Sequence, residues 1–289
     1  MRILLTGGTG FIGSHFLKQA LAKNHSVVAL RRSPQSKPKI SIDREPEWLN
    51  RHLDEVTKAD IAGCDVVVHL AAHSVQHPFD NLTTCLYWNT TAALHLFEQA
   101  RLAGVKHYVV AGSCFEYGLS ADRFETIPTD APLEPNNSYA VSKAVTSIAL
   151  RQWTCEHQLS IELLRIFHVF GEGESKTRFW PSLRRAALSG KNFSMTPGQQ
   201  MRDFLPVEDV AQIFVRRAIL DQLYNQRYNV FNIGTGSPCT LLAFAKYWWS
   251  FWKAEGKLLV GDIPYRENEI MSYLPGEELL LTDKATIYT

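Results

Sequence analysis

A glycine-rich turn near the start of the chain is the feature that most constrains its fold. The segment Thr6-Gly-Gly-Thr-Gly-Phe-Ile-Gly13 directly follows the apolar run Ile3-Leu-Leu5. This order predicts a buried strand that turns through glycines into a helix, whose free N-terminal amides can hold a pyrophosphate. The glycines would serve the tight turn, the close approach of backbone to phosphate, and the packing of helix on strand. We therefore predict a dinucleotide site that includes Gly7, Gly10, Phe11, Ile12 and Gly13.

The residues after the second predicted strand decide which dinucleotide fits. The segment Ser26-Val-Val-Ala-Leu30 predicts that strand, and Arg31-Arg32-Ser33 follows it with no carboxylate nearby. Proteins that bind NAD place an acid here for the ribose 2′-hydroxyl, whereas a 2′-phosphate needs cationic partners. Arg31, Arg32 and Ser33 therefore favour NADP(H), with NAD as the alternative cofactor. A solvated basic loop is the interpretation without a ligand.

The composition argues against several other classes of protein. The chain has 289 residues, of which 45% are hydrophobic and 20% charged, and its net charge is +1. Such a chain can form a sizeable globular core, and its charge gives no reason to expect nucleic acid or a membrane as a partner. No apolar run approaches the ~20 residues that a membrane helix requires. We expect no signal peptide, because the first residues already form the nucleotide-binding strand.

Cysteines and histidines give no sign of a metal site. The five cysteines, at positions 64, 85, 114, 155 and 239, are scattered and contain no Cys-x-x-Cys pair. Their number and spacing argue for a reducing compartment and against structural zinc. His73 and His77 share a helical spacing, but no third ligand lies at a suggestive distance in the sequence, so we expect surface or packing histidines. The expected location is the cytoplasm.

Strands and helices alternate along most of the chain. Helices are predicted from Asn89 to Ala103 and from Tyr139 to His157, and loops at 33–46, 118–138 and 171–178. The alternation predicts an α/β fold with a doubly wound parallel (Rossmann) sheet, whose ligands sit beyond the carboxyl ends of the strands. The further strands are predicted at Asp65–Ala72, His107–Gly112 and Ser160–Phe167.

A smaller C-terminal lobe is expected beside this sheet. Residues 1–170, with about 205–235, would form the dinucleotide-binding domain. Residues 171–204 and 236–289 would form a substrate-binding lobe that is rich in aromatic residues and cations. The segment Tyr247-Trp-Trp-Ser-Phe-Trp252 has helical spacing and follows other apolar residues, which favours a lobe core over an exposed patch.

A tyrosine and a lysine are the clearest candidates for chemistry. In Tyr139-Ala-Val-Ser-Lys143 the phenol and the ammonium are four residues apart, hence on one face of the predicted helix. A free tyrosine has a pKa of about 10, which a nearby cation lowers. Tyr139 could then exchange a proton with a substrate oxygen while hydride moves on carbon. Ser113, at the end of a predicted strand, could hydrogen-bond the same oxygen. Each feature alone has a structural interpretation, but their order on this architecture favours catalysis.

Seven segments together make the chain resemble the extended short-chain dehydrogenase/reductases, or NAD-dependent epimerase/dehydratase family, that act on nucleotide-activated sugars. The resemblance implies Ser113, Tyr139 and Lys143 as the catalytic trio. It also implies a homodimer, formed through the helices near 89–103 and 139–157. The segments are Thr6-Gly-Gly-Thr-Gly-Phe-Ile-Gly13, Asp65-Val-Val-Val-His-Leu-Ala-Ala72, Gly112-Ser-Cys-Phe-Glu-Tyr-Gly118, Tyr139-Ala-Val-Ser-Lys143, Leu164-Arg-Ile-Phe-His-Val-Phe-Gly171, Arg202-Asp-Phe-Leu-Pro-Val-Glu-Asp209 and Asn232-Ile-Gly-Thr-Gly236.

The same resemblance assigns further contacts to the cofactor and the substrate. Arg202 and Arg266 are implied as cations that clamp the diphosphate of a sugar nucleotide, with a surface ion pair as the alternative for each. Against the cofactor, it places Leu70, Ala71, Ala72 and Ile166.

Departures from the family pattern narrow the reaction. Sugar 4,6-dehydratases carry an Asp-Glu pair just after the catalytic hydroxyl residue, but this chain has Cys114 and Phe115 there. Glu116 comes one residue later, where strand alternation should turn it to the opposite face. Both points argue against dehydration. His168 stands where the family usually has asparagine, so contacts with the substrate are altered there. We expect Phe115 and His168 to contact the substrate.

The cofactor separates the remaining reactions. Epimerases oxidise and re-reduce one substrate and retain NAD, whereas net reduction consumes hydride that cells commonly supply as NADPH. Arg31 and Arg32 therefore favour NADPH-dependent reduction of the C4 ketone of a nucleoside-diphosphate 4-keto-6-deoxyhexose. The segment Gly112–Gly118 is also similar to that of nucleotide-linked 4-keto-6-deoxyhexose reductases. The alternatives are an NAD-dependent nucleotide-sugar 4-epimerase and a non-catalytic dinucleotide-binding sensor.

Overall fold

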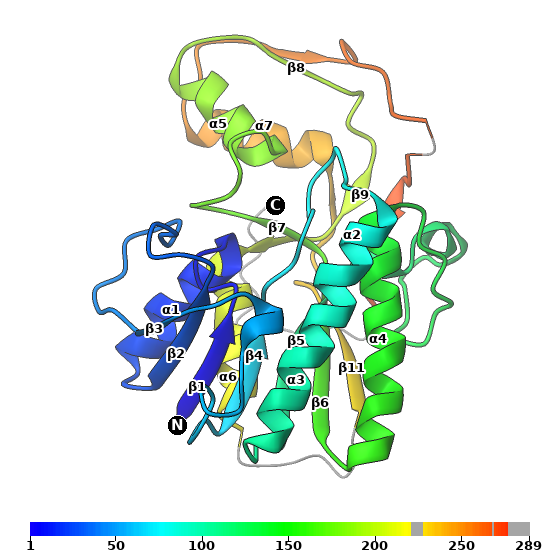
Figure 1. The fold of residues 1–289 in the computed structure, drawn as a ribbon. Helices are drawn as coiled ribbons and strands as arrows, with labels where there is room; N and C mark the ends of the chain where they lie inside the picture. Colours follow the sequence, from blue (N-terminus) through cyan, green and yellow to red (C-terminus); the bar gives the residue numbers. More distant parts are fainter. Residues whose placement is uncertain (221–227, 268, 277–289) are drawn as a thin grey trace.

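A seven-stranded parallel sheet forms the centre of the molecule (Figure 1). The computed structural model describes residues 1–220, 228–267 and 269–276. The sheet has the order β3-β2-β1-β4-β5-β6-β11, and neighbouring strands are parallel throughout. The predicted doubly wound parallel sheet is therefore confirmed. Its strands are β1 (Arg2–Thr6), β2 (Ser26–Arg31), β3 (Glu47–Asn50), β4 (Val66–His69), β5 (His107–Ser113), β6 (Ser160–Ile166) and β11 (Tyr228–Ile233).

Helices cover both faces of the sheet, which explains why its central strands are apolar almost without interruption. On one face, α1 (Phe11–Ala22) and α6 (Val207–Ala218) pack against Ile3 and Leu5 of β1. On the other, α3 (Ala92–Leu102) and α4 (Ser138–His157) pack in the core that contains Leu4. Successive side chains of β1 thus enter two separate cores, as the pleat of a strand requires.

The winding of the sheet reverses at β1. The chain adds β2 and β3 on one side of β1 and then crosses to β4 on its other side. In the register of this pair, Thr6 lies opposite His69, so the turn after β1 meets the segment after β4. Such a reversal point leaves a crevice at the carboxyl edge, where ligands of open α/β sheets bind.

A smaller lobe lies above the carboxyl edge of the sheet (Figure 1). The chain enters the lobe through β7 (His168–Phe170) and leaves it through β10 (Phe204–Pro206), and these two strands pair in parallel. Residues 277–289, which were predicted to belong to the lobe, lie outside the described residues. The lobe contains α5 (Phe179–Leu188), β8 (Phe193–Met195), β9 (Met201–Arg202), β12 (Cys239–Thr240), α7 (Leu241–Phe251), β13 (Leu258–Val260) and β14 (Ser272–Tyr273).

The aromatic segment of α7 contributes to the core of this lobe. Trp249 is buried with Leu183 of α5, and Trp248 and Trp252 pack against the same cluster. The expectation of a lobe core is correct for these tryptophans. It is wrong for Phe251, whose surface is 62% exposed, because this position faces away from α5 on the amphipathic helix.

Three element boundaries differ from the sequence prediction. The edge strand β3 was not predicted, because its four residues, unlike the four buried residues of β4, form no apolar run. β4 ends at His69, three residues before the predicted end. The helix expected from Asn89 begins earlier, as α2 (Leu82–Leu86), whose first turn is capped by the Asn81 side chain. It then passes through a π-helical turn at Tyr87–Thr91 into α3. None of the described helices combines the length and the apolar character needed to cross a bilayer.

Candidate active site

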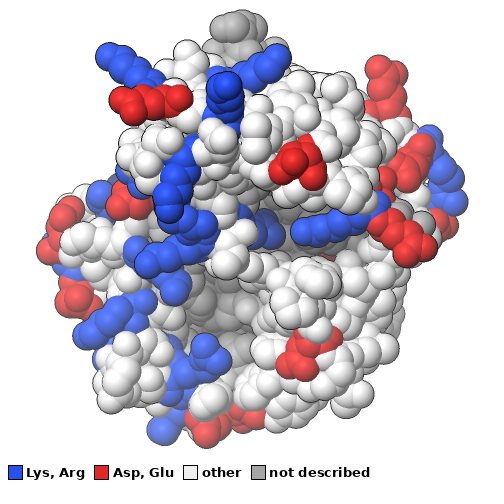
Figure 2. All heavy atoms as spheres, turned by 90° about the horizontal axis from the view of Figure 1, so that it is seen from above, with Lys and Arg blue, Asp and Glu red and all other residues white. Residues whose placement is uncertain are grey.

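A cleft of about 820 Å³ opens at the carboxyl edge of the sheet, where the winding reverses. Figure 2 shows it from above as a hollow with Lys and Arg side chains around it. All the predicted cofactor residues except Ser33 line this cleft. The Ser33 hydroxyl lies 3.4 Å from that of Ser36, which does line it.

The glycine turn forms a cradle that only glycines can make. Gly7 has a positive φ of 75°, and a Cβ atom there would lie 2.6 Å from the Ala71 nitrogen. A Cβ atom on Gly13 would lie 2.0 Å from the Gly7 carbonyl oxygen. The Ala71 amide also donates to the Thr6 hydroxyl at 3.2 Å, which holds the segment after β4 against the turn.

Helix α1 begins at this cradle, and no side chain caps its N-terminus. The free amides and the positive end of the helix dipole therefore face the cleft, as a pyrophosphate requires. Because Gly7, Gly10 and Gly13 carry no side chains, the backbone at these positions is open to close approach. These residues thus fit the diphosphate of a dinucleotide.

The predicted trio meets in the cleft. Ser113 ends β5, while Tyr139 and Lys143 project from the first turns of α4, whose N-terminus is capped by the Asn137 side chain. All three line the cleft and are buried. The Lys143 ammonium donates to the Ala111 carbonyl oxygen of β5 at 2.6 Å. The helix and the strand that carry the trio are therefore tied together beside the site.

Burial governs the protonation of this trio. It raises the pKa of Tyr139, and a hydrogen bond with Ser113 offsets this only in part. From the sequence we expect Lys143, helped by the positive charge of an oxidised nicotinamide, to lower this pKa; in the protein by itself the pKa is raised, because loss of hydration disfavours the phenolate. Burial lowers the pKa of Lys143, and the charge of Glu116 counteracts that change. The phenol is thus held in its protonated form.

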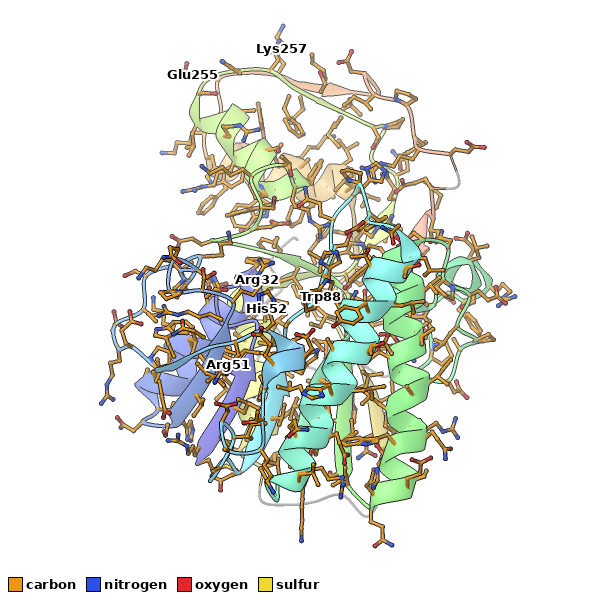
Figure 3. The ribbon with its side chains drawn as sticks, viewed as in Figure 1. Arg32, Arg51, His52, Trp88, Glu255 and Lys257 are labelled. Atoms are coloured by element: carbon orange, nitrogen blue, oxygen red, sulfur yellow. The ribbon has the colours of Figure 1, made fainter. Side chains whose placement is uncertain are left out.

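One end of the cleft is strongly cationic. Arg31, Arg32, Lys37, Lys39 and Arg51 all line it, and Arg32 and Arg51 are labelled in Figure 3. Arg31 is already engaged: its Nε donates to Asn50 at 2.8 Å, and its guanidinium lies 4.6 Å from the centre of the Trp48 ring. Arg51 follows β3, the neighbour of β2, so the two strand ends present their cations side by side.

The predicted substrate residues are not equally placed. Phe115 lines the cleft, whereas His168, Arg202 and Arg266 are not among its lining residues. The His168 ring lies 6.3 Å from that of Phe115, and burial keeps the pKa of this histidine well below its usual value. Arg266 is exposed on the lobe.

Arg202 is bound within the protein itself. One terminal nitrogen donates to the Met201 and Met271 carbonyl oxygens, and the other to Ile270 and to the Glu269 carboxylate at 3.1 Å. The ion-pair alternative therefore describes Arg202 in this structure, although the pair is buried rather than on the surface.

Two lining residues of opposite charge were missed by the sequence analysis. Arg178, just before α5, donates to the Glu174 carboxylate at 3.3 Å, and both side chains face the cleft. Burial raises the pKa of Glu174 to about 7. Both residues fall in the predicted loop 171–178, where no periodic pattern marks them. Arg51, Lys37 and Lys39 were missed for similar reasons.

The residues after Ser113 form a helical turn rather than a continued strand. Cys114, Phe115 and Glu116 make one 3₁₀ turn, so the expectation of strand alternation was wrong in its reason. Glu116 nevertheless faces away from the cleft, as expected, because it is buried and is not among the residues that line the cleft. Cys114 is also buried, which raises its pKa to about 12. Neither side chain is placed to remove water from a substrate in the cleft.

A comparison with known proteins identifies the family of this chain. The model of the NAD-dependent epimerase/dehydratase family matches residues 3–234. The chain belongs to this family. Members of the family are NAD(P)-dependent oxidoreductases and epimerases that act on nucleotide sugars, and the protein is an enzyme of this kind.

Individual relatives of this family member are distant but span most of its length. It is 27% identical to the UDP-glucose 4-epimerase of Bacillus subtilis (strain 168), over 92% of this chain and 84% of that protein. It is 24% identical to the CDP-abequose synthase of Salmonella muenchen, over 93% of this chain and 87% of the synthase.

Solved structures show the same fold. MoeE5 in complex with UDP-glucuronic acid and NAD is 26% identical, with a TM-score of 0.82 over 96% of this chain and 90% of that one. The UDP-N-acetylglucosamine 4-epimerase from Methanobrevibacter ruminantium M1 has a TM-score of 0.87 at 20% identity, over 99% and 94% of the two chains.

Proposed function

We propose that this enzyme uses NADPH to reduce the C4 ketone of a nucleoside-diphosphate 4-keto-6-deoxyhexose. The observation that carries the proposal is the cationic end of the cleft. Arg32 and Arg51 border it from two neighbouring strand ends, and among the described residues that line the cleft the only acid is Glu174, which already binds Arg178. No acid stands directly after β2, where a ribose 2′-hydroxyl would require one, whereas a 2′-phosphate has several cationic partners in the cleft.

The adenosine end of such a cofactor also has an aromatic neighbour. Trp88, from the π-helical turn, lines the same cleft as Arg51 and Leu53, and Figure 3 labels it near His52. The His52 ring lies 5.7 Å from the Trp88 ring. We assign Trp88 to the adenine, because a flat apolar ring packs well against an indole.

Bound NADPH would supply hydride for the reduction. Tyr139, which burial keeps protonated, donates its proton to the oxygen of the ketone. The Ser113 hydroxyl binds the same oxygen and orients it toward the phenol. Lys143 keeps its ammonium between β5 and the cleft, where it can hold a ribose hydroxyl and restore charge balance around Tyr139.

The substrate would extend from the trio toward the lobe. Phe115 lines this side of the cleft, and we retain His168, Arg202 and Arg266 as proposed substrate contacts. Arg178 joins them as the lobe cation that already faces the cleft. For Arg202 to bind a diphosphate, its bond with Glu269 would have to be exchanged for the substrate.

A direct assay tests the proposed reaction. The purified enzyme is mixed with a panel of nucleoside-diphosphate 4-keto-6-deoxyhexoses and either NADPH or NADH, and oxidation of the cofactor is followed at its absorbance maximum. We expect turnover with NADPH and at least about a tenfold lower kcat/KM with NADH. Absence of turnover across a broad panel, or a preference for NADH, would contradict the proposal.

An NAD-dependent nucleotide-sugar 4-epimerase is the second candidate, and the UDP-glucose 4-epimerase relatives favour it. Tightly retained NAD in the purified protein and interconversion of two sugars without added cofactor would establish that activity. The third candidate, a non-catalytic sensor, would require that Tyr139→Phe leave the biological activity unchanged.

We propose a homodimer formed through the helices on the α3 and α4 face of the sheet. We also propose a reducing, cytoplasmic location, which the five free cysteines support.

A further inference from the structure

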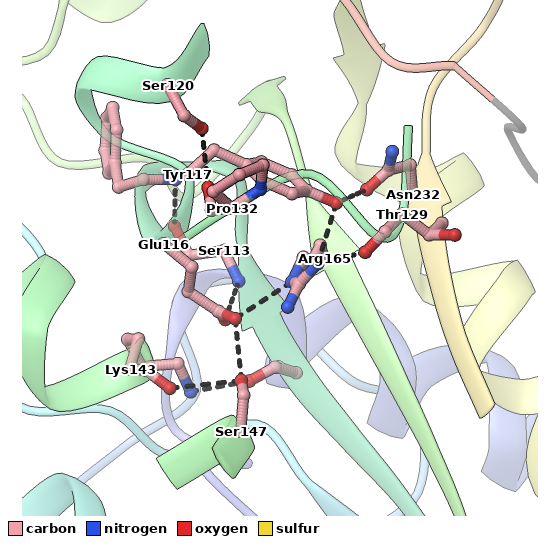
Figure 4. A network of polar contacts seen from close by, with 12 residues as sticks. Ser113, Glu116, Tyr117, Ser120, Thr129, Pro132, Lys143, Ser147, Arg165 and Asn232 are labelled. Carbon is pink, nitrogen blue, oxygen red and sulfur yellow. Dashed lines mark hydrogen bonds and ion pairs between the residues drawn. The ribbon is translucent and has the colours of Figure 1, made fainter. Parts of the chain in front are cut away.

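A buried network of charged and polar groups lies behind Ser113, on the side away from the cleft (Figure 4). Its centre is Glu116, whose side chain is completely buried. One carboxylate oxygen accepts the backbone N–H of Ser113 at 2.8 Å. The other accepts the Ser147 hydroxyl at 2.6 Å and the Nε of Arg165 at 2.9 Å.

Arg165 compensates the charge of this carboxylate and is itself held in place. It extends from β6, and its Nη1 donates to the Tyr117 hydroxyl and the Thr129 carbonyl oxygen, both at 2.8 Å. The Tyr117 hydroxyl in turn donates to Asn232 at 2.6 Å. A buried carboxylate is tolerated only when it is paired and hydrogen-bonded in this way.

The network connects the two elements that carry the catalytic trio. Ser147 lies one helical turn after Lys143 on α4, so Glu116 is bonded to both the end of β5 and the body of α4. The bond from Lys143 to Ala111 is a second connection between the same helix and strand. The positions of Ser113 and Tyr139 relative to each other are thus set from behind the cleft.

The strand makes room for this arrangement directly before Ser113. Gly112 lies opposite Arg165 in the register of β5 and β6. A Cβ atom on Gly112 would lie 3.0 Å from both a Glu116 carboxylate oxygen and the Arg165 Cγ atom. A side chain here would push the ion pair away from the catalytic serine.

We propose that Glu116, with Arg165 as its counter-ion, is a positioning residue that fixes Ser113 and couples it to the helix bearing Tyr139 and Lys143. The inference rests on the part of the proposed function that assigns the chemistry to these three residues. It holds for a reductase and for an epimerase alike.

The chain offers a matched control in a second buried ion pair. Glu162 of β6 binds Arg217 of α6, and both side chains are buried. Glu162 lies opposite Val109 in the middle of the sheet, and it does not line the cleft. Glu162→Gln therefore reports the loss of a buried ion pair that has no part in the site.

The first test compares Glu116→Gln with Glu162→Gln in the turnover assay. Because displacement of a catalytic group by about 1 Å can cost roughly 100-fold, we expect a kcat about 10 to 100 times lower for Glu116→Gln, with little change in KM. Glu162→Gln should keep the wild-type kcat. In a Ser113→Ala background, Glu116→Gln should cause a much smaller further loss, since Glu116 acts through Ser113. Equal kcat values for the two glutamine variants, or losses that simply multiply, would overturn the proposal.

A second variant covers the case in which Glu116→Gln does not fold. Ser147→Ala removes only the bond to α4 and leaves no charge unpaired, so it should fold and lower kcat several-fold. Crystal structures give a readout that needs no substrate: Ser113 should shift relative to Lys143 in Glu116→Gln or Ser147→Ala and stay in place in Glu162→Gln. If the wild type turned over no sugar nucleotide, the proposed function would fail, and this shift would still decide the inference. An unmoved Ser113 would refute it.

Discussion

Two opposing physical effects act on the pKa of Tyr139. Burial holds the proton on its phenol, and the hydrogen bond with Ser113 favours its release. A proton donor for a developing alkoxide has to keep its proton until hydride moves, and burial provides this. The proposed reduction would therefore require no change in the protonation of Tyr139 before the substrate arrives.

Replacing this tyrosine separates catalysis from binding. Tyr139→Phe should lower kcat by about 100-fold or more, because the proton donor is lost, while the affinity for NADPH stays near that of the wild type. Steady-state kinetics and fluorescence titration with NADPH measure the two effects. The control is Tyr108→Phe, another buried tyrosine with a raised pKa, which lies outside the cleft. Full activity of Tyr139→Phe would exclude the proposed mechanism.

Arg32 and Arg51 should discriminate between the two dinucleotides. Removing either cation with alanine should weaken NADPH binding by about 10-fold or more, because a charge-assisted bond to phosphate is lost, and should leave NADH binding unchanged. Isothermal titration with both dinucleotides measures the difference. Arg44→Ala, whose guanidinium binds Asn24 far from the cleft, is the control. Equal losses for NADPH and NADH would show that these arginines do not contact a 2′-phosphate.

The residues that could be predicted from sequence belong to local motifs. Gly7 and Gly13 are fixed by the backbone of one turn, and the spacing of Tyr139 and Lys143 is fixed by one helix. The position of Arg51 in the cleft could not be predicted, because this residue follows a short edge strand that has no recognisable sequence pattern. The partners of Arg202 come from residues 269–271, nearly seventy positions away, and no local signal indicates them.

At the scale of elements, the turn between β1 and α1 depends on space as well as on backbone conformation. Gly7 and Gly63 have the same φ of 75°, but a Cβ atom on Gly63 would meet nothing within 4 Å. The two glycines therefore separate the cost of the positive φ from the cost of a clash.

Alanine at the two positions should give different results. Gly63→Ala should cost about 1 kcal/mol of folding stability from backbone strain alone and leave NADPH binding intact. Gly7→Ala should cost more, and it should also abolish NADPH binding, because the added methyl group collides with the segment after β4. Denaturant unfolding and NADPH titration measure these effects. Equal stabilities and intact binding for both variants would contradict the role of the cradle.

The sheet could be predicted from sequence because its central strands are apolar and separated by helices. The lobe could be located but not described. Its strands have two or three residues each, and their pairing depends on contacts between distant segments, such as β9 with β14. The turn at Cys114–Glu116 was misread as a strand, because the buried bonds of Glu116 decide its conformation.

At the scale of the whole molecule, the pH dependence of stability should reflect Glu174. Its pKa rises from 4.5 to about 7 on folding, so the folded state is favoured below pH 4.5 and loses that advantage as pH rises through about 7. Glu174→Gln removes this effect and should be more stable than the wild type above pH 7, by up to about 3 kcal/mol. Unfolding curves at several pH values measure the gap, which should shrink toward pH 4.5. A gap that did not change with pH would contradict the assignment.

The outer face of α4 offers a test of the proposed dimer. Ile148 is 63% exposed there, beside Val145 on the same helix. Ile148→Glu should convert a dimer into monomers in analytical ultracentrifugation, because a carboxylate would be buried without a partner. Leu188→Glu, at a position 62% exposed on the lobe, should leave the dimer intact. A monomeric wild type, or a dimer that survives Ile148→Glu, would argue against this interface.

For the proposed reduction, the burial of the phenol also determines how the rate in each direction depends on pH. Reduction of the ketone uses the proton that the Tyr139 phenol carries at neutral pH. Oxidation of the alcohol needs the ionised phenol to accept a proton, and this form is rare because burial raises the pKa of Tyr139. Alcohol oxidation should therefore accelerate about tenfold for each pH unit of alkalinisation, while ketone reduction stays level over the same range. Initial rates measured in both directions across a series of pH values test this expectation, and an oxidation rate that did not rise with pH would contradict the role of Tyr139 as the group that exchanges the proton.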